Sequence, residues 1–329
     1  MAVHSNGSGE AGPTTAALRR PVSFEVKAVR AQRRLRRPVA TEAGSAAASA
    51  PKPERAASDP VAEPRVARSG GAPLLRAEDV TVRFGGLVAN DAVSITVREG
   101  TVTALIGPNG AGKTTFFNVL TGAQESTSGR VWLRDRELTG RSRADIARAG
   151  VARTFQNLQL FESLTLEENV LVGAARHARS GLLRCLTPAP SVRRDESRLR
   201  QMAARALEVT NLTSLASVRA ADLPYGDRRR AEIARALASS PEILLLDEPS
   251  AGMDPRETTE LGRLISRIVD AFEVSVLMVE HDMSMVREFV DYVYVLDFGR
   301  LIVDGPPLDV LRDERVVEAY LGTREAGRA

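Results

Sequence analysis

The stretch Gly107-Pro108-Asn109-Gly110-Ala111-Gly112-Lys113-Thr114-Thr115 decides the fold of this chain. It matches the phosphate-binding loop pattern G-x-x-x-x-G-K-S/T. The preceding residues 102–106 are apolar and predict a buried strand, and residues 115–120 are apolar enough to begin a packed helix. A strand, a glycine-rich loop and a helix in this order are the context in which the pattern binds nucleotide phosphates.

Each part of this loop has a task in nucleotide binding. Its glycines let the backbone curl until the N–H groups point at a phosphate, and the helix N-terminus adds partial positive charge. Lys113 supplies a full charge toward the β- and γ-phosphates, and the Thr114 hydroxyl is placed to ligate Mg²⁺. A tight turn without a ligand would not require Lys and Thr at these positions.

Length and composition restrict the class of protein. The chain has 329 residues, of which 43% are hydrophobic, and helix and strand patterns alternate from about residue 74, which favours an α/β fold. Cys185 is the only cysteine, which fits a reducing compartment. No apolar run reaches the roughly 18 residues that span a bilayer, and the first residues lack the apolar core of a secretory signal. We therefore expect a soluble or peripheral protein on the cytoplasmic face of the membrane.

Residues 1–72 differ from the rest of the chain. They are rich in Ala, Pro and Arg, and they contain 12 Lys and Arg but only 6 Asp and Glu. We predict a disordered basic tail, because such a segment cannot bury enough apolar surface to order itself. Its cluster at residues 30–37 either has no role or contacts anionic lipid or RNA, and the tail could also precede the true start. Since the whole chain carries +3, the remainder is net acidic, and we expect no nucleic acid there.

Two further regions surround the loop in the sequence. Residues 80–84 and 93–97 alternate in polarity and residues 130–134 resemble them, which predicts a small antiparallel β layer. Phe84, at the end of the first of these strands, either stacks on an adenine ring or belongs to the core. Helical patterns then dominate, with an apolar stripe along residues 193–212, and predict an inserted helical subdomain of about residues 157–238.

Two buried strands end in polar residues. An apolar run at residues 243–246 is followed by Asp247 and Glu248, and residues 274–279 are followed by Glu280 and His281. Ligands bind at the carboxyl ends of strands in an open α/β sheet. Asp247 is therefore a candidate for Mg²⁺, and Glu248 for polarising a water that attacks the γ-phosphate; the alternative is a pair of solvated carboxylates.

Weaker signals accompany this pair. Gln156, at the end of a strand predicted over residues 151–155, is a candidate to orient water and metal, and His281 to contact the γ-phosphate. Asp297-Phe298-Gly299 spells a kinase motif, but the kinase catalytic loop is absent, so we predict a turn between strands at 292–296 and 301–303.

The order of these motifs resembles the nucleotide-binding subunit of ABC transporters over about residues 74–322. The motifs are the phosphate loop, Gln156, Leu223-Pro224-Tyr225-Gly226-Asp227, the strand ending in Asp247-Glu248, Ser250-Ala-Gly-Met-Asp254 and His281. The resemblance implies a P-loop NTPase core with an antiparallel β subdomain and an inserted helical subdomain over residues 73–322, followed by a flexible end, 323–329. It further implies a two-subunit sandwich in which ATP lies between the phosphate loop of one subunit and the signature segment 223–227 of the other. Asp254 would lie in the loop that joins the two sites, and Gln156 would couple the site to a membrane subunit.

Four segments narrow the resemblance to the ATPases of branched-chain amino-acid importers: residues 106–122, 152–157, 223–227 and 316–322. This implies ATP and Mg²⁺ as cofactors, with Glu248, His281 and Gln156 in catalysis. The implied partners are two membrane-spanning permease subunits, an identical or paralogous ATPase subunit and, indirectly, an extracytoplasmic solute-binding protein. The alternatives are an ATPase for urea, another small polar solute or lipopolysaccharide export, or a non-transport ABC ATPase.

The signature segment departs from the family's common L-S-G-G-Q. Pro224 replaces Ser, Tyr225 replaces Gly and Asp227 replaces Gln, while Arg228 stands where the importer group usually has Gln. The serine hydroxyl contact to the γ-phosphate is therefore missing from the site that this segment would complete on a partner.

Overall fold

The computed structural model describes residues 71–154, 159–178 and 190–326, all within one compact unit, Pro60–Ala329. The predicted disorder of the tail up to residue 70, and the position of Gln156, lie outside these described residues. Helix α9 (Glu314–Ala326) continues into the segment 323–329, for which the sequence predicted a flexible end.

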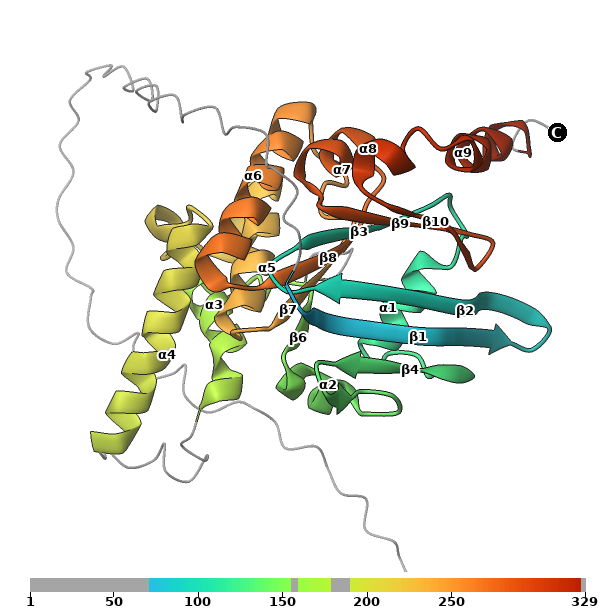
Figure 1. Cartoon of the computed structure of the whole chain (residues 1–329). Coiled ribbons are helices and arrows are strands. Elements are labelled where there is room, and N and C mark those ends of the chain that lie inside the picture. Colours follow the sequence, from blue (N-terminus) through green and yellow to red (C-terminus); the bar gives the residue numbers. More distant parts are fainter. Residues whose placement is uncertain (1–70, 155–158, 179–189, 327–329) are drawn as a thin grey trace, which may run out of the picture. The chain divides into compact units, whose positions relative to one another are not determined.

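A six-stranded sheet forms the centre of this unit (Figure 1). Its strands, in spatial order, are β10 (Arg300–Gly305), β9 (Tyr292–Asp297), β3 (Val102–Ile106), β8 (Ser275–Val279), β7 (Ile243–Asp247) and β6 (Val151–Arg153). Neighbours from β9 to β6 run parallel, and only β10 is antiparallel to β9. The phosphate loop follows β3, so it lies at the carboxyl edge of the sheet, where Asp247 also ends β7. The predicted turn at Phe298–Gly299 between β9 and β10 is confirmed.

Alternate residues of the central strands enter two different cores. Ala104 and Ile106 of β3 pack with helices α3 to α6, whereas Leu105 between them packs with α1 and the second sheet. Because both faces of the sheet are covered, these strands are continuous apolar runs rather than alternating ones. This explains why their sequence pattern was so plain.

The second sheet is the predicted antiparallel β layer. Its four strands, in spatial order, are β2 (Leu87–Arg98), β1 (Pro73–Phe84), β4 (Ser128–Leu133) and β5 (Arg136–Glu137). Strands β1 and β2 are much longer than the alternating segments at 80–84 and 93–97, because their pairing extends over polar positions and several register shifts. Helix α1 (Lys113–Leu120) packs between this sheet and the central one through Phe116 and Phe117.

The predicted helices between residues 166 and 238 gather on the other face of the central sheet (Figure 1). They are α3 (Leu166–Ala174), α4 (Pro190–Val209) and α5 (Tyr225–Ala238), with short 3₁₀ turns η1 (Ala175–His177), η3 (Thr213–Leu215) and η4 (Ala220–Asp222). Helix α4 stops before the predicted residue 212, because Asn211 adopts a left-handed conformation with φ 56°. The remaining helices are α2 (Arg143–Ala149), α6 (Pro255–Phe272), α7 (Met283–Phe289) and α8 (Pro307–Val310).

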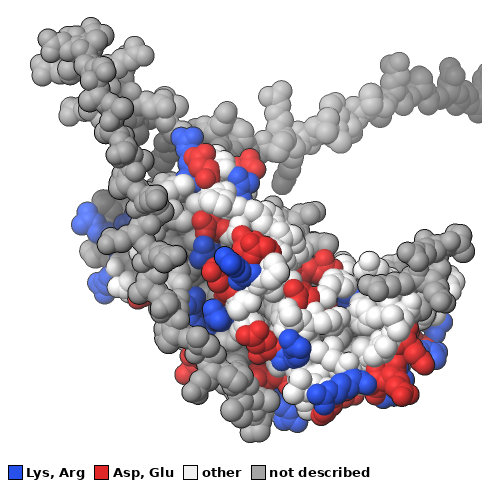
Figure 2. All heavy atoms as spheres, turned by 90° about the horizontal axis from the view of Figure 1, so that it is seen from above, with Lys and Arg blue, Asp and Glu red and all other residues white. Residues whose placement is uncertain are grey.

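The surface seen in Figure 2 carries charges of both signs, with basic and acidic side chains interspersed among uncharged ones. Several exposed charges of the described residues pair along one helix or turn, as Arg200 does with Glu196 at 2.7 Å and Arg315 with Asp313 at 2.9 Å.

Candidate nucleotide site

The structure brings Phe84, the phosphate loop and Glu248 to one cleft of about 380 Å³, here called the phosphate-loop cleft. Residues 109–115 line it, together with Glu248 from the end of β7 and Phe84 and Leu87 from the turn between β1 and β2. These segments lie far apart in the sequence. They meet because β3 and β7 end at the same edge of the sheet and the β1–β2 turn reaches over that edge.

Two glycines make the loop geometry possible. A Cβ on Gly107, whose φ is 149°, would stand 2.0 Å from the carbonyl oxygen of Leu296. A Cβ on Gly112, at φ 98°, would stand 2.3 Å from the carbonyl oxygen of Ala89. The loop therefore lies so close to strands β9 and β2 that no side chain fits at these two positions.

The start of α1 is suited to an anion. Gly112 gives it no side-chain cap, unlike Ser142, Thr165, Asp254 and Asp282, which cap α2, α3, α6 and α7. The first N–H groups of an α-helix lack partners within the helix. The first residues of α1, Lys113 to Thr115, line the cleft, so a phosphate bound there could accept from these donors.

Lys113 is buried beneath the loop. Its ammonium donates to the carbonyl oxygens of Gly107 at 2.7 Å and Pro108 at 2.8 Å. Burial lowers the pKa of Lys113, and the nearby Glu248 and Asp247 carboxylates oppose this. The two carboxylates are therefore near enough to the amine for their charges to act on it.

The Mg²⁺ candidates Thr114 and Asp247 supply oxygen ligands, as this cation prefers. Thr114 lies exposed on the first turn of α1, and Asp247 is buried in an ion pair with Arg153 at 2.7 Å. No cluster of three or more His, Cys, Asp or Glu side chains in the described part of the chain could hold a metal. The donor set thus fits a cation shared between a few side chains and a bound phosphate rather than a protein cage.

Glu248 has an unusual backbone. Its φ is 48°, a backbone conformation that residues other than glycine rarely adopt. The backbone N–H donates to the Val279 carbonyl at 3.0 Å, and the side-chain oxygen lies 3.0 Å from Nε2 of His281. The two predicted catalytic side chains at the ends of β7 and β8 are therefore in direct contact.

Arg229 of α5 supports this backbone, and sequence reasoning missed it. The side chain is 1% exposed and donates to the carbonyl oxygens of Glu248 at 2.8 Å and Pro249 at 3.3 Å. It also pairs with the buried Glu232 one turn along α5, at 3.3 Å. A run of three arginines in an amphipathic helix carries no signal that the middle one is buried.

Glu280 was missed as well, although it stands beside His281. Its buried carboxylate accepts from the backbone N–H of His281 at 2.8 Å and of Asp282 at 3.2 Å. It also accepts from the N–H of Ser250 at 3.0 Å and from the Ser250 hydroxyl at 2.9 Å. Glu280 thus ties the loop after β8 to the segment that follows Glu248. The available signal in the sequence was that Glu280, like Asp247 and Glu248, is a polar residue at the end of an apolar strand.

The signature segment stands at the start of α5, which has no side-chain cap at Pro224. Tyr225 donates its hydroxyl proton to the Ala251 carbonyl at 3.2 Å. Arg228 donates to the Leu223 carbonyl at 2.8 Å, so this departure from the family pattern secures the turn before the helix. Asp254 caps α6 through the N–H groups of Arg256 and Glu257 and is exposed.

Two exposed aromatic side chains stand at the rim of the cleft. Phe84 is 48% exposed, so it does not belong to the core. Phe298, in the predicted turn between β9 and β10, is 86% exposed and lines the same cleft. Its turn is fastened to the loop, since Gly299 donates to the Ala111 carbonyl at 3.0 Å. The cleft therefore offers apolar surface beside its phosphate-binding part.

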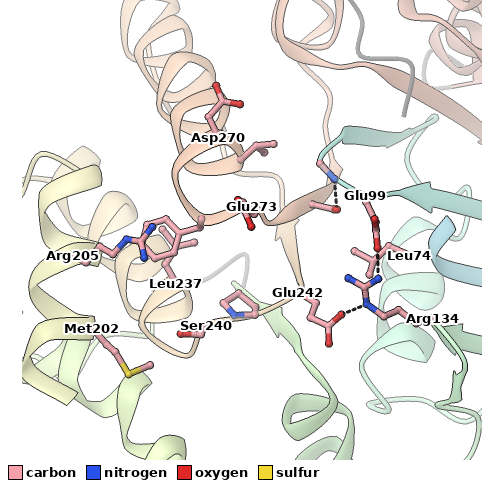
Figure 3. Close-up of a pocket in the computed structure, with 15 residues that line it drawn as sticks. Leu74, Glu99, Arg134, Met202, Arg205, Leu237, Ser240, Glu242, Asp270 and Glu273 are labelled. Carbon is pink, nitrogen blue, oxygen red and sulfur yellow. Dashed lines mark hydrogen bonds and ion pairs between the residues drawn. The ribbon is translucent and has the colours of Figure 1, made fainter. Parts of the chain in front are cut away.

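A larger hollow of about 840 Å³ lies elsewhere (Figure 3). It opens at the amino ends of β3, β7 and β8, the edge of the sheet opposite to the phosphate loop. Its arginines already have partners, since Arg134 pairs with Glu99 and with Glu242 at 2.6 Å, and Arg205 lies over the Phe272 ring. Size alone would select this hollow, but the chemistry selects the phosphate-loop cleft.

Comparison with known proteins agrees with this geometry. The model of the ABC transporter family matches residues 90–251, and that of the branched-chain amino acid ATP-binding cassette transporter matches residues 300–326. The chain is 44% identical over 250 residues to the high-affinity branched-chain amino acid transport ATP-binding protein LivG of Salmonella typhimurium (strain LT2). That match covers 76% of this chain and 98% of LivG. The chain belongs to the ABC transporter family of ATP-binding cassettes.

Other relatives place this cassette in the same group. It is 44% identical to BraF of Pseudomonas aeruginosa, a branched-chain amino acid transport ATP-binding protein, over 76% of this chain and 98% of BraF. The crystal structure of a nucleotide-free ATP-binding cassette from an ABC transporter matches with a TM-score of 0.66 and 32% identity, over 76% of this chain and 99% of that one. The crystal structure of a cassette in its ADP conformation matches with a TM-score of 0.67 and 33% identity, again over 76% of this chain and 99% of that one. The predicted family and fold class are confirmed.

The cassettes of this family are ATPases that energise transport, so nucleotide binding by this chain is shown by its membership. Among the described helices none is long and apolar enough to cross a membrane.

Proposed function

We propose that the phosphate-loop cleft binds Mg-ATP and hydrolyses it to energise the uptake of branched-chain amino acids. The backbone of residues 109–115 and the N-terminus of α1 would hold the phosphates, with the Lys113 ammonium turning from the loop carbonyls to the β- and γ-phosphates. Phe84 would stack on the adenine ring. Mg²⁺, held by Thr114 and Asp247, would neutralise charge on the phosphates.

Glu248 is the general base in this proposal. Its carboxylate accepts a proton from water while the water oxygen bonds to the γ-phosphorus and the bond to the β–γ bridging oxygen breaks, which leaves ADP and phosphate. His281, 3.0 Å from the carboxylate, would hold it in place and contact the γ-phosphate. Gln156 would orient the water and the cation.

The transport cycle would need a second ATPase subunit, identical or paralogous. ATP would then lie between this chain's phosphate loop and the partner's signature segment, and Asp254 would stand in the loop between the two sites. In the reverse direction, Leu223–Asp227 offers the partner's ATP the uncapped N–H groups of α5 but no serine hydroxyl. The two sites of a mixed dimer would therefore differ.

Two separate permease subunits would form the membrane path, and an extracytoplasmic solute-binding protein would deliver the solute. The chain would then act at the cytoplasmic face of the membrane. The names of LivG and BraF, each matched over 98% of its length, support branched-chain amino acids as the solutes.

The observation that carries this proposal is that Lys113 and Glu248 line the same cleft as the rest of the phosphate loop. The test is uptake of radiolabelled leucine and of urea in a strain that lacks this chain. Leucine uptake should fall and should return with the wild-type chain but not with Glu248→Gln, while urea uptake stays constant. Loss of urea uptake alone would make urea the solute instead. If neither uptake changed, both the branched-chain amino-acid importer and the urea importer would be refuted.

A further inference from the structure

Helix α9 reaches the phosphate loop. The backbone N–H of Gly107 donates to the phenolic oxygen of Tyr320 over 2.7 Å, although the two residues stand 213 positions apart. One helical turn before Tyr320, Val316 is buried in the core, and both side chains pack against the same cluster. Helix α9 contacts β10 at the edge of the sheet (Figure 1). The tyrosine therefore enters the site from a segment that carries none of the phosphate-binding motifs.

The hydrogen bond acts on the residue that also holds Lys113. Gly107 is gripped on both sides, because its N–H donates to Tyr320 and its carbonyl oxygen accepts from the Lys113 ammonium at 2.7 Å. It is also closely packed, since a Cβ at this position would stand 2.0 Å from the carbonyl oxygen of Leu296. The hydroxyl of Tyr320 thus fixes the first turn of the loop, and the loop in turn fixes the lysine.

We propose that Tyr320 is a positioning residue of the nucleotide site and that α9 is a working part of phosphate binding. The inference rests on the proposed role of residues 107–115 in holding phosphates. Without the hydroxyl, the Gly107 N–H loses its acceptor and the loop gains other conformations, so part of the binding energy must be used to order it. Burial raises the pKa of Tyr320 to about 12, so the phenol stays neutral at assay pH and the contact does not depend on its ionisation.

The test compares two substitutions that each remove one tyrosine hydroxyl. Tyr320→Phe deletes the contact with the loop. Tyr292→Phe deletes a hydroxyl that donates to the Asp304 carboxylate at 2.5 Å, between β9 and β10 and away from the loop. Dissociation constants for Mg-ADP are measured by calorimetry on the full chain, together with KM and kcat for ATP and hydrogen exchange of a peptide containing residues 102–112.

Tyr320→Phe should raise the Kd for Mg-ADP roughly tenfold, as expected when a backbone donor is left without its partner. KM for ATP should rise with it, while kcat stays within about twofold because Glu248 and His281 keep their contacts. The peptide 102–112 should exchange faster in the nucleotide-free variant. Tyr292→Phe should leave all three measurements at their wild-type values.

Two results would overturn the inference. Wild-type affinity and unchanged exchange at residues 102–112 in Tyr320→Phe would mean that the tyrosine only seats α9. The same holds if exchange rises in α9 alone and Mg-ADP still binds normally. A wild-type chain that does not bind Mg-ADP at all would instead refute the proposed function of the loop, and this inference with it.

Discussion

Replacing Arg229 by methionine separates two tasks of one buried side chain. Arg229 forms a buried ion pair with Glu232 of the same helix, α5, and it donates to the carbonyl oxygen of Glu248 at 2.8 Å. Methionine fills similar space but neither pairs with a carboxylate nor donates. We expect the substitution to harm both the stability of the fold and the placement of the catalytic carboxylate.

The magnitudes follow from burial. Both members of the Arg229–Glu232 pair are 1% exposed, and removing one partner of such a pair costs about 3 to 5 kcal/mol of unfolding free energy. Loss of a hydrogen bond from a charged donor is worth about 1.5 to 3 kcal/mol. If that energy holds Glu248 at its φ of 48°, kcat should fall about 10- to 100-fold.

The double variant Arg229→Met/Glu232→Gln distinguishes the two effects. It removes both charges, and the glutamine oxygen can still accept from the N–H of Gln159, as Glu232 does at 3.3 Å. Stability should return to within about 1 to 2 kcal/mol of wild type, because replacing both partners of a buried pair is nearly neutral. The kcat should not return, since the Glu248 carbonyl still lacks this donor.

The measurements are thermal and denaturant unfolding and steady-state ATP hydrolysis. Arg200→Met, which removes an exposed pair with Glu196, is the control and should change stability by less than about 0.5 kcal/mol. A double variant that regains wild-type kcat would refute the reasoning, because activity would then have depended on stability alone.

The destabilisation should also depend on pH. Burial raises the pKa of Glu232 above its ordinary value of 4.5, and the Gln159 N–H and the Arg229 charge oppose this. Arg229→Met removes one opposing influence, so the folded pKa rises further. A folded state that binds a proton more tightly loses stability as pH rises through the window between the two pKa values. The single variant should therefore be closer to wild type at low pH than at high pH, and the double variant should show no such trend.

Changes at Glu248 and Phe84 and a deletion test the site and the tail. Glu248→Gln should keep Mg-ATP binding while turnover falls at least about 100-fold, because the base is lost and the phosphate contacts remain; an unchanged kcat would exclude this role. Phe84→Ala should raise KM for ATP about tenfold through lost base stacking, and Phe84→Tyr should restore it; equal KM values in all three proteins would remove Phe84 from the site. Deleting residues 1–70 should leave kcat and the melting temperature unchanged, and a large loss of folded protein would show that the tail is structural.

The parts of the site that sequence reasoning could find are those that carry their own local pattern. The phosphate loop and Asp247-Glu248 stand at fixed places relative to an apolar strand, so strand, loop and ligand edge could be predicted together. The contact of His281 with Glu248 could not be predicted from the sequence, because it depends on β7 and β8 being neighbours in the sheet.

The residues that were missed depend on tertiary contacts. Arg229 and Arg153 bind partners on other elements, and nothing in their immediate sequence separates them from solvated arginines. Glu280 had only its place directly after the apolar strand β8 as a signal. Tyr320 belongs to a segment that supported the family resemblance, but its hydrogen-bond donor, the N–H of Gly107, lies 213 positions away in the sequence. Phe84 remained undecided between core and cleft until its exposure was known.

The neighbours of β3 have a consequence for biosynthesis. Strand β3 leads into the phosphate loop, yet it is flanked by β8 and β9, and the loop is held further by Tyr320. Since ribosomes add about 5 to 20 residues per second, the loop emerges on the order of ten seconds before these supports exist. A nascent or prematurely terminated chain would therefore carry the nucleotide motif without the strands and the tyrosine that hold the loop in place. We expect such a chain not to hydrolyse ATP.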